Sequence, residues 1–176
     1  VVDHAPDAFG GLDQVLTGGE RLSPSHVRRF LDRWPGIRLI NGYGPTETTV
    51  NALHQVVTPE IAAAGAIPIG RPYRGYEVFL LDRDGRPLSD EAGIEGELVV
   101  AGPGVALGYH ERPEKTMESF PPDPRPGRTG RVYRTGDLVQ RRADGSFDFL
   151  GRTDRQVKVA GRRVELDGIE AVLDAQ

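Results

Sequence analysis

Two short polar stretches hold the residues best suited to chemistry, and the first is "INGYGPTETT", residues 40–49. Tyr43 offers a flat face for stacking, Thr46 a hydroxyl group, and Glu47 a hard oxygen ligand of the type that Mg²⁺ prefers. The glycines permit backbone shapes closed to other residues and let a ligand approach the main chain. Binding of a nucleoside triphosphate requires such a set of groups; a simple β-turn with a surface glutamate is the alternative interpretation.

The second stretch begins with "YRTGDL", residues 133–138, in which Asp137 follows a glycine within a strand-like pattern. A buried carboxylate there can accept two hydrogen bonds from vicinal hydroxyl groups, such as those of a ribose. "GRTDRQVKVAGRRVEL" then adds Arg152, Asp154 and Lys158 beside a glycine-flanked loop. Each residue taken alone has an ordinary explanation, since an aspartate in a strand is often a bulge or turn residue.

A strand–helix–strand unit is predicted ahead of the first polar stretch. "LDQVLTGGE" predicts a short strand that runs into a Gly-Gly turn, and "IRLI" predicts a second strand. Between them "SPSHVRRFLDRWPG" predicts a helix, with Ser23 as the N-cap and Pro24 at the first helical position. Its apolar face at i, i+3, i+4 and i+7 consists of Val27, Phe30, Leu31 and Trp34. Such a unit favours parallel strands, and ligands bind beyond their carboxyl ends, where "TGGE" and "NGYGPTE" lie.

The rest of the chain predicts two further parts. Short strands broken by Asp-Gly turns, in "YEVFLLDRDG", "GELVVAG", "VYRTGDLVQRRADG" and "SFDFLG", predict an antiparallel β subdomain. "RQVKVAGRRVELDGIEAVLDAQ" predicts a strand, a glycine turn and a helix that is cut short. The expected fold class is α/β (α+β overall). Its parts are the end of a parallel α/β subdomain at 1–74, the antiparallel β subdomain at 75–152, and a hinge with the start of a small C-terminal α+β subdomain at 153–176.

Composition narrows the class of protein. The 176 residues contain no cysteine, which excludes disulfides and thiolate metal sites. With no signal peptide and no apolar run of about 18 residues, we expect a soluble, cytoplasmic protein with no membrane partner. Residues 125–163 carry 11 basic and 4 acidic side chains, and this charge of +7 indicates an anionic partner or a solvated arginine-rich surface. Nucleic acid is not expected, because this segment has almost no lysine and its aromatic residues fit strand patterns.

Taken together, the motifs closely resemble one family over essentially the whole chain. They are "LTGGE", "NGYGPTETT", "IGRPYRGYEVFLLD", "GELVVAGPGVALGYHERPEKTMESF", "YRTGDLVQRRADGSFDFLGRTDRQVKVAGRRVEL" and "IEAVL". Their order and spacing resemble the adenylation domain of nonribosomal peptide synthetases. This domain belongs to the adenylate-forming enzymes, a class that also holds acyl-CoA synthetases and luciferases. The motifs are nearer in form to those of amino-acid activators than to those of CoA ligases.

The resemblance implies a nucleotide site. Its residues would be Asn41, Gly42, Tyr43, Gly44, Thr46, Asp137, Phe149 and Arg152. Asn41 and Tyr43 would contact the base, whereas Asp137 would hold the ribose hydroxyl groups with help from Arg152. Phe149 stands where the family often has a tyrosine, so that a stacking face is kept and a hydroxyl group is lost.

The resemblance also implies catalytic and mobile residues. Thr46 would contact the α-phosphate and Glu47 would bind Mg²⁺, and these two are the expected catalytic residues. Asp154 would be the hinge on which the C-terminal subdomain rotates between two half-reactions. Lys158 and Gly161 would belong to a loop of that subdomain.

The implied reaction has two steps, with ATP and Mg²⁺ as cofactors. An amino-acid carboxylate attacks the α-phosphate of ATP and releases pyrophosphate, and the phosphopantetheine thiol of a peptidyl carrier protein then takes the acyl group. An MbtH-like activator protein is a further candidate partner, near "FPPDPRPGRTGRVYRTGD". The implied walls of the amino-acid pocket are Leu16, Gly18, Gly42, Val50 and Asn51. Two glycines leave volume and Asn51 offers a donor and an acceptor, so a medium or large side chain with some polarity is expected.

Three functional groups of the family lie outside this sequence. They are the phosphate loop with its lysine, the acidic residue that holds the substrate amine, and the catalytic lysine of the C-terminal subdomain. We therefore expect a piece of a longer domain that is inactive alone. The alternatives are an acyl- or aryl-CoA ligase of the same fold, or a non-catalytic docking or scaffold piece.

Overall fold

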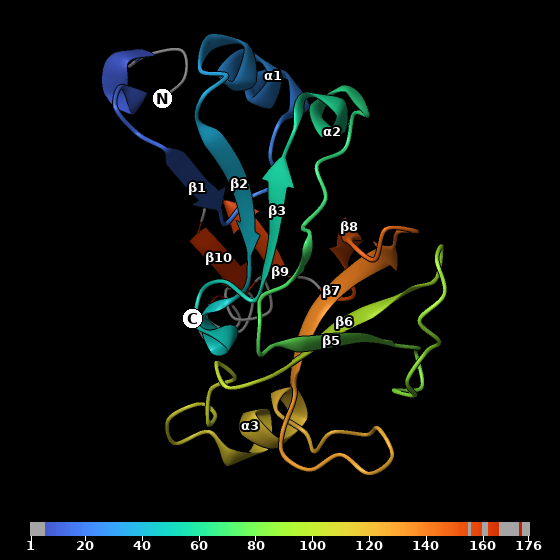
Figure 1. Cartoon of the computed structure of the whole chain (residues 1–176). Helices are drawn as coiled ribbons and strands as arrows, with labels where there is room; N and C mark the ends of the chain where they lie inside the picture. The colour runs from blue at the N-terminus through green and yellow to red at the C-terminus, as the bar shows by residue number, and fades with distance from the viewer. Residues whose placement is uncertain (1–5, 155, 160–161, 166–172, 174–176) are drawn as a thin grey trace.

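The computed structural model describes residues 6–154, 156–159, 162–165 and 173 (Figure 1). The elements before the first loop are η1 (Pro6–Phe9), β1 (Gln14–Gly18), α1 (Pro24–Arg33) and β2 (Arg38–Tyr43). They are followed by η2 (Thr46–Thr48), β3 (Leu53–Val57), α2 (Pro59–Ala63) and β4 (Arg71–Pro72). The remaining elements are β5 (Glu77–Leu81), β6 (Glu95–Ala101), α3 (Pro113–Ser119), β7 (Tyr133–Arg141), β8 (Phe147–Arg152), β9 (Gln156–Val159) and β10 (Arg162–Glu165).

The first sheet has the order β1-β2-β3-β4, and it is mixed. β1 pairs with β2 in parallel, as the strand–helix–strand pattern predicts, whereas β2 pairs with β3 and β3 with β4 in antiparallel fashion. The expected parallel arrangement therefore holds for β1 and β2, and the sheet as a whole is mixed. Residues 44–52 connect β2 to β3, and a connection of this length is shorter than the dozen or more residues that a parallel crossover needs.

Helix α1 has the predicted position and apolar face. Pro24 opens the helix after Ser23, but the Ser23 hydroxyl makes no bond to the backbone of the first turn. It pairs with the side chains of Ser25 and His26 instead, each at 2.9 Å. The apolar face of α1 packs on α2 and on β2 and β3, and the buried members of this cluster are Val27, Phe30, Ile37, Leu39, Val57, Ala62 and Ile67.

The second sheet confirms the antiparallel prediction, with the order β5-β6-β7-β8 and antiparallel pairing throughout. An Asp-Gly turn closes the β7–β8 hairpin, as expected. Gly145 has a φ of +80°, and the amide of Arg142 donates to the carbonyl of Ser146 at 2.8 Å. In Figure 1 the carboxyl ends of β1 and β2 point away from α1 and α2 and toward this sheet. The loop after β2 contacts segments that flank this sheet, since the Tyr76 hydroxyl donates to the Thr48 carbonyl at 2.9 Å and the Ala106 amide donates to the Glu47 carbonyl at 2.8 Å.

One hydrophobic cluster is shared by the two sheets. The segment around β3 contributes Ala52, Leu53 and Ile69, and the second sheet contributes Leu80, Leu98, Val100, Val139 and Phe147. Backbone bonds join the same two parts, since the amide of Ile69 donates to Phe147 at 2.9 Å and the amide of Phe147 donates to Gly70 at 3.0 Å. This shared core fixes the first loop relative to β7 and β8.

The third part begins with a hairpin, in which β9 and β10 pair antiparallel. The sequence prediction had a strand, a glycine turn and a helix, and it did not separate β10 as a strand. The glycine turn and, apart from Leu173, the predicted helix lie outside the described residues. No helix within the described ranges is both long and apolar enough to span a bilayer.

Candidate functional site

The two polar stretches meet at the carboxylate of Asp137. Tyr43, the last residue of β2, donates a hydrogen bond from its hydroxyl to Oδ2 of Asp137, 94 residues away in sequence. Arg152 donates from Nη1 to Oδ1 at 2.5 Å. Asp137 and Arg152 are direct partners across the β7–β8 pair, so the sheet register brings the guanidinium to the carboxylate. The structure thus brings together three of the expected nucleotide-binding residues.

The Asp137 carboxylate is a buried acceptor. Only 7% of the residue is exposed, and its own amide is held by the hydroxyl of Thr135 at 3.0 Å. Burial, and then the negative charge of Asp137, raise the pKa of the Tyr43 hydroxyl well above its ordinary value. The Tyr43 phenol therefore keeps its proton at neutral pH and acts as a donor to the carboxylate.

Arg152 also links Asp137 to the expected hinge residue, Asp154. Its Nε and Nη2 atoms donate to the two carboxylate oxygens of Asp154, both at 2.6 Å. Oδ1 of Asp154 further accepts from the amide of Gln156 at 3.0 Å. Gly136 makes room for this arrangement, because its φ is +68° and a Cβ there would lie 2.7 Å from Nη2 of Arg152. One guanidinium group thus bridges two carboxylates at the junction of β8 and β9.

Glu47 lies in the one-turn 3₁₀ helix η2, and only 8% of it is exposed. Its Oε1 accepts a hydrogen bond from the hydroxyl of Tyr109 at 2.7 Å. Burial, and then this bond to Glu47, raise the pKa of the Tyr109 hydroxyl. The neighbouring Thr46 is exposed. Sequence reasoning assigned no role to Tyr109, although it lies in the quoted "GPGVALGYHERPEKTMESF".

Four of the five expected pocket residues lie close to one another. Gly18 and Gly42 are partners in the parallel β1–β2 pair. A Cβ on Gly42 would lie 2.6 Å from Oδ1 of Asn51 and 3.1 Å from Cδ1 of Leu16, so both side chains face the glycine. Val50, the fifth residue, is 66% exposed.

Other expected site residues have structural partners. A Cβ on Gly44 would lie 2.7 Å from the Ala52 amide nitrogen and from the Val50 carbonyl oxygen, so close packing of the turn requires a glycine there. The side-chain amide of Asn41 donates to the carbonyl of Pro68 at 2.8 Å. Phe149 packs against the shared core.

Two expected residues remain without a described side chain. Lys158 lies in β9, but its side chain is outside the described part, as is the whole of Gly161. Within the described ranges, no group of three or more His, Cys, Asp or Glu residues could hold a metal ion.

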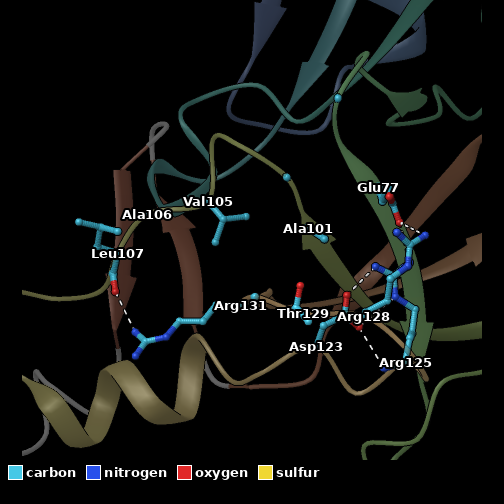
Figure 2. Close-up of a pocket in the computed structure, with 13 residues that line it drawn as sticks. Glu77, Ala101, Val105, Ala106, Leu107, Asp123, Arg125, Arg128, Thr129 and Arg131 are labelled. Atoms are coloured by element: carbon cyan, nitrogen blue, oxygen red, sulfur yellow. Dashed lines mark hydrogen bonds and ion pairs between the residues drawn. The ribbon is translucent and has the colours of Figure 1, made fainter.

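A separate groove of about 500 Å³ contains part of the arginine-rich segment, and none of the expected site residues lines it (Figure 2). Arg125 pairs with Asp123 at 2.7 Å and with Glu77 at 3.0 Å. Arg128 pairs with Glu77 at 2.9 Å. Much of the positive charge here is therefore neutralised by acidic residues of the protein itself, which weakens the argument for an anionic partner at this place.

Comparison with known proteins defines the class. Residues 2–110 match the family of AMP-binding enzymes, and the chain belongs to this family. AMP-binding enzymes of this family use ATP.

The similar proteins give the particular relationship. The chain is 42% identical over 172 residues to tyrocidine synthase 3 of Brevibacillus parabrevis, covering 97% of this chain and 3% of that protein. It is 44% identical over 173 residues to the chondramide synthase cmdD of Chondromyces crocatus, covering 96% of this chain and 4% of that protein. Its fold matches PA1221, an NRPS protein containing adenylation and PCP domains, with a TM-score of 0.91, 44% identity and coverage of 99% of this chain and 35% of that one. The resemblance to nonribosomal peptide synthetase adenylation domains is confirmed, and the chain spans only a small part of these relatives.

Proposed function

We propose that this chain is part of an amino-acid-activating adenylation domain. In the complete domain, an aminoacyl-adenylate is made from ATP and an amino acid and then passed to the pantetheine thiol of a carrier protein. The observation that carries this proposal is the buried Asp137 carboxylate, which accepts hydrogen bonds from Arg152 and from Tyr43. Tyr43 is the residue at which the loop that holds Glu47 begins.

The nucleotide site is proposed around this carboxylate. A carboxylate has about four acceptor positions, so bonds from protein donors and from ribose hydroxyl groups can coexist on Asp137. Tyr43 and Arg152 fix its orientation, and a fixed acceptor loses less entropy when the ribose binds. Asn41, Gly42, Gly44 and Phe149 are proposed to complete the site around the base, although the described contacts of Asn41 and Gly44 are with the protein itself.

Glu47 fits a magnesium ion that is bound mainly by phosphates. Mg²⁺ in nucleotide sites is commonly held by one or two carboxylates plus phosphate oxygens and waters, and a single glutamate is such a donor set. When bound, the ion neutralises charge on the phosphates. The exposed hydroxyl of Thr46, the preceding residue, is proposed to donate to the α-phosphate.

The proposed chemistry depends on positioning more than on proton transfer. The substrate carboxylate is already ionised at neutral pH, so its oxygen attacks the α-phosphorus without a general base while pyrophosphate leaves. Charge that develops at phosphorus is stabilised by fixed donors and cations. Leu16, Gly18, Gly42 and Asn51 are proposed to line the amino-acid pocket, with Val50 at its edge.

The partner of the second step is proposed from the solved relative, in which adenylation and PCP domains occur in one protein. The acyl group passes from the adenylate to the carrier thiol, and AMP leaves. An MbtH-like protein remains a candidate activator. We also propose the boundaries 1–74, 75–152 and 153–176, with Asp154 as the hinge between the last two parts.

The test is amino-acid-dependent ATP–pyrophosphate exchange by the complete protein that carries this chain, measured against a panel of amino acids. Exchange with one or a few amino acids supports the proposal. Exchange with a fatty or aromatic acid, followed by transfer to CoA, identifies an acyl- or aryl-CoA ligase instead. Absence of exchange with every acid favours a docking role. We expect the 176-residue chain alone to give no exchange.

A further inference from the structure

We propose that Tyr109 is a positioning residue, whose hydroxyl group holds the Glu47 carboxylate in the orientation in which it meets the metal ion of the nucleotide. This inference rests on the proposed function. It assigns a role to a contact between two segments that are 62 residues apart.

Both the side chain and the backbone of Glu47 are held by the loop that leads to α3. The Tyr109 hydroxyl donates to Oε1 at 2.7 Å, and the amide of Ala106 donates to the carbonyl of Glu47 at 2.8 Å. A carboxylate can accept a hydrogen bond on one oxygen and coordinate a cation through the other. The bond to Oε1 therefore selects a rotamer of Glu47 without preventing metal binding.

Tyr109 is itself fixed in place. Its amide donates to the hydroxyl of Thr116 in α3 at 2.9 Å, and its ring meets Phe120 edge-on with the ring centroids 5.4 Å apart. At Gly108, with a φ of +146°, a Cβ would lie 2.3 Å from Cγ2 of Thr116, so the loop lies directly against the helix. Because both the backbone and the ring of Tyr109 are held, its hydroxyl group keeps a fixed position. Without these contacts the Glu47 side chain would sample more rotamers, and selecting one in advance favours binding.

Tyr76 provides a matched comparison, because its side chain contacts the same turn, η2. Its hydroxyl group donates to the carbonyl of Thr48 at 2.9 Å, one residue beyond Glu47. Tyr76 directly precedes β5 and Tyr109 lies between β6 and α3, and both hydroxyl groups reach η2. Of these two contacts, only that of Tyr109 is with the carboxylate. Replacing either with phenylalanine removes one hydroxyl group and keeps the ring. The pair separates orientation of the carboxylate from simple support of the turn.

The experiment uses the complete protein with the variants Tyr109→Phe, Tyr76→Phe and Glu47→Gln. Binding of Mn²⁺, as a magnetic stand-in for Mg²⁺, is measured by electron paramagnetic resonance in the presence of a non-hydrolysable ATP analogue. We expect Tyr109→Phe to weaken Mn²⁺ binding about tenfold, as for the loss of a hydrogen bond to a charged group. Tyr76→Phe should stay within about twofold of the wild type, and Glu47→Gln should weaken binding more than Tyr109→Phe does.

A second measurement follows the Mg²⁺ dependence of pyrophosphate exchange. Tyr109→Phe should raise the Mg²⁺ concentration for half-maximal exchange while kcat recovers at saturating Mg²⁺. If Glu47→Gln weakens Mn²⁺ binding and Tyr109→Phe does not, the positioning role is refuted while the proposed metal site stands. Equal weakening by Tyr109→Phe and Tyr76→Phe also refutes it, because the effect would come from support of the turn. No effect of Glu47→Gln would refute both the metal role of Glu47 and the inference that depends on it.

Discussion

Replacement of Asp137 with asparagine is the sharpest test of the proposed nucleotide site, because it removes the charge and keeps the size of the side chain. In the structure the carboxylate accepts hydrogen bonds from Tyr43 and from Arg152, and the side chains of Asp137 and Arg152 are 11% and 15% exposed. Asparagine keeps one oxygen acceptor but presents an NH₂ group to the second donor. One charge-assisted hydrogen bond is therefore lost.

The size of the effect follows from these contacts. A hydrogen bond to a charged group contributes roughly 1.5–3 kcal/mol. Arg152 keeps its two bonds to Asp154, at 2.6 Å each, so it is not left as an unpaired buried charge and the larger penalty for breaking a buried pair does not apply. In a folding unit of about 150–250 residues, a loss of roughly 1.5–3 kcal/mol lowers the Tm by about 3–12 °C, and the shift is smaller in the larger complete protein. If Asp137 is the proposed acceptor for the ribose, loss of its charge should weaken ATP binding by about tenfold to a hundredfold.

The assay is titration calorimetry with ATP and thermal unfolding, both on the complete protein. Asp148→Asn is the matched control, because Asp148 accepts from Arg142 at 3.1 and 3.0 Å near the opposite end of the same β7–β8 pair. The control should lower the Tm slightly and leave the Kd for ATP unchanged. If the Kd of Asp137→Asn stays within about twofold of the wild type while its Tm falls, the carboxylate has a structural role only, and the reasoning is refuted.

Three further predictions concern stability and movement. The Arg125 guanidinium beside Asp123 holds the pKa of that carboxyl below its ordinary value, so the carboxylate stabilises the fold above about pH 4 and this stabilisation is lost as the pH falls further. Asp123→Asn should therefore lower the Tm at pH 7, and its difference in Tm from the wild type should shrink below about pH 4. A difference that stays constant with pH would contradict this. Gly70→Ala should lower the free energy of unfolding, measured with denaturant, by more than about 3 kcal/mol, because the new Cβ would lie 1.8 Å from a backbone oxygen. Gly65→Ala, also at positive φ but with open space around it, should lower it by about 1 kcal/mol. Equal losses would show that the backbone at Gly70 shifts to make room. Asp154→Pro should preserve one half-reaction and depress the other in the complete protein, measured by pyrophosphate exchange and carrier loading, and equal loss in both would exclude a hinge.

The first strand–helix–strand unit was predictable because its signals are local. The spacing of Val27 and Phe30 indicates the helix, and the apolar run before the polar loop indicates the strand, without knowledge of any contact distant in sequence. The antiparallel pairing of β3 with β2 was not predicted. The chain reverses there through Thr49 and Val50, which have φ values of 58° and 69°. Residues branched at Cβ rarely adopt this conformation, so nothing in their type predicts a chain reversal there.

The candidate site was predictable in its residue types and not in its contacts. Asp137 was expected as an acceptor and Arg152 as its neighbour at the ribose, whereas Tyr43 was expected to stack on the base. The bond from Tyr43 to Asp137 joins segments 94 residues apart, and only the packing of two sheets creates it. Tyr109 carried no signal of its own, because its position depends on how the loop packs on α3. The pairing of Arg152 with Asp154 is different. Arg152 ends β8 and Asp154 lies two residues beyond it, so this contact joins residues that are close in sequence and needs no long-range packing.

The core that the two sheets share has a consequence for building chimeras between related synthetases. A chimera that changes parent at residue 74/75 would combine Ala52, Leu53 and Ile69 from one protein with Val139 and Phe147 from another. Interior side chains interdigitate closely, so such a chimera would face mismatched shapes at the centre of the molecule even though the joint itself lies in a loop. A joint after residue 152 would inherit this whole cluster from one parent, and it should give the better-folded hybrid.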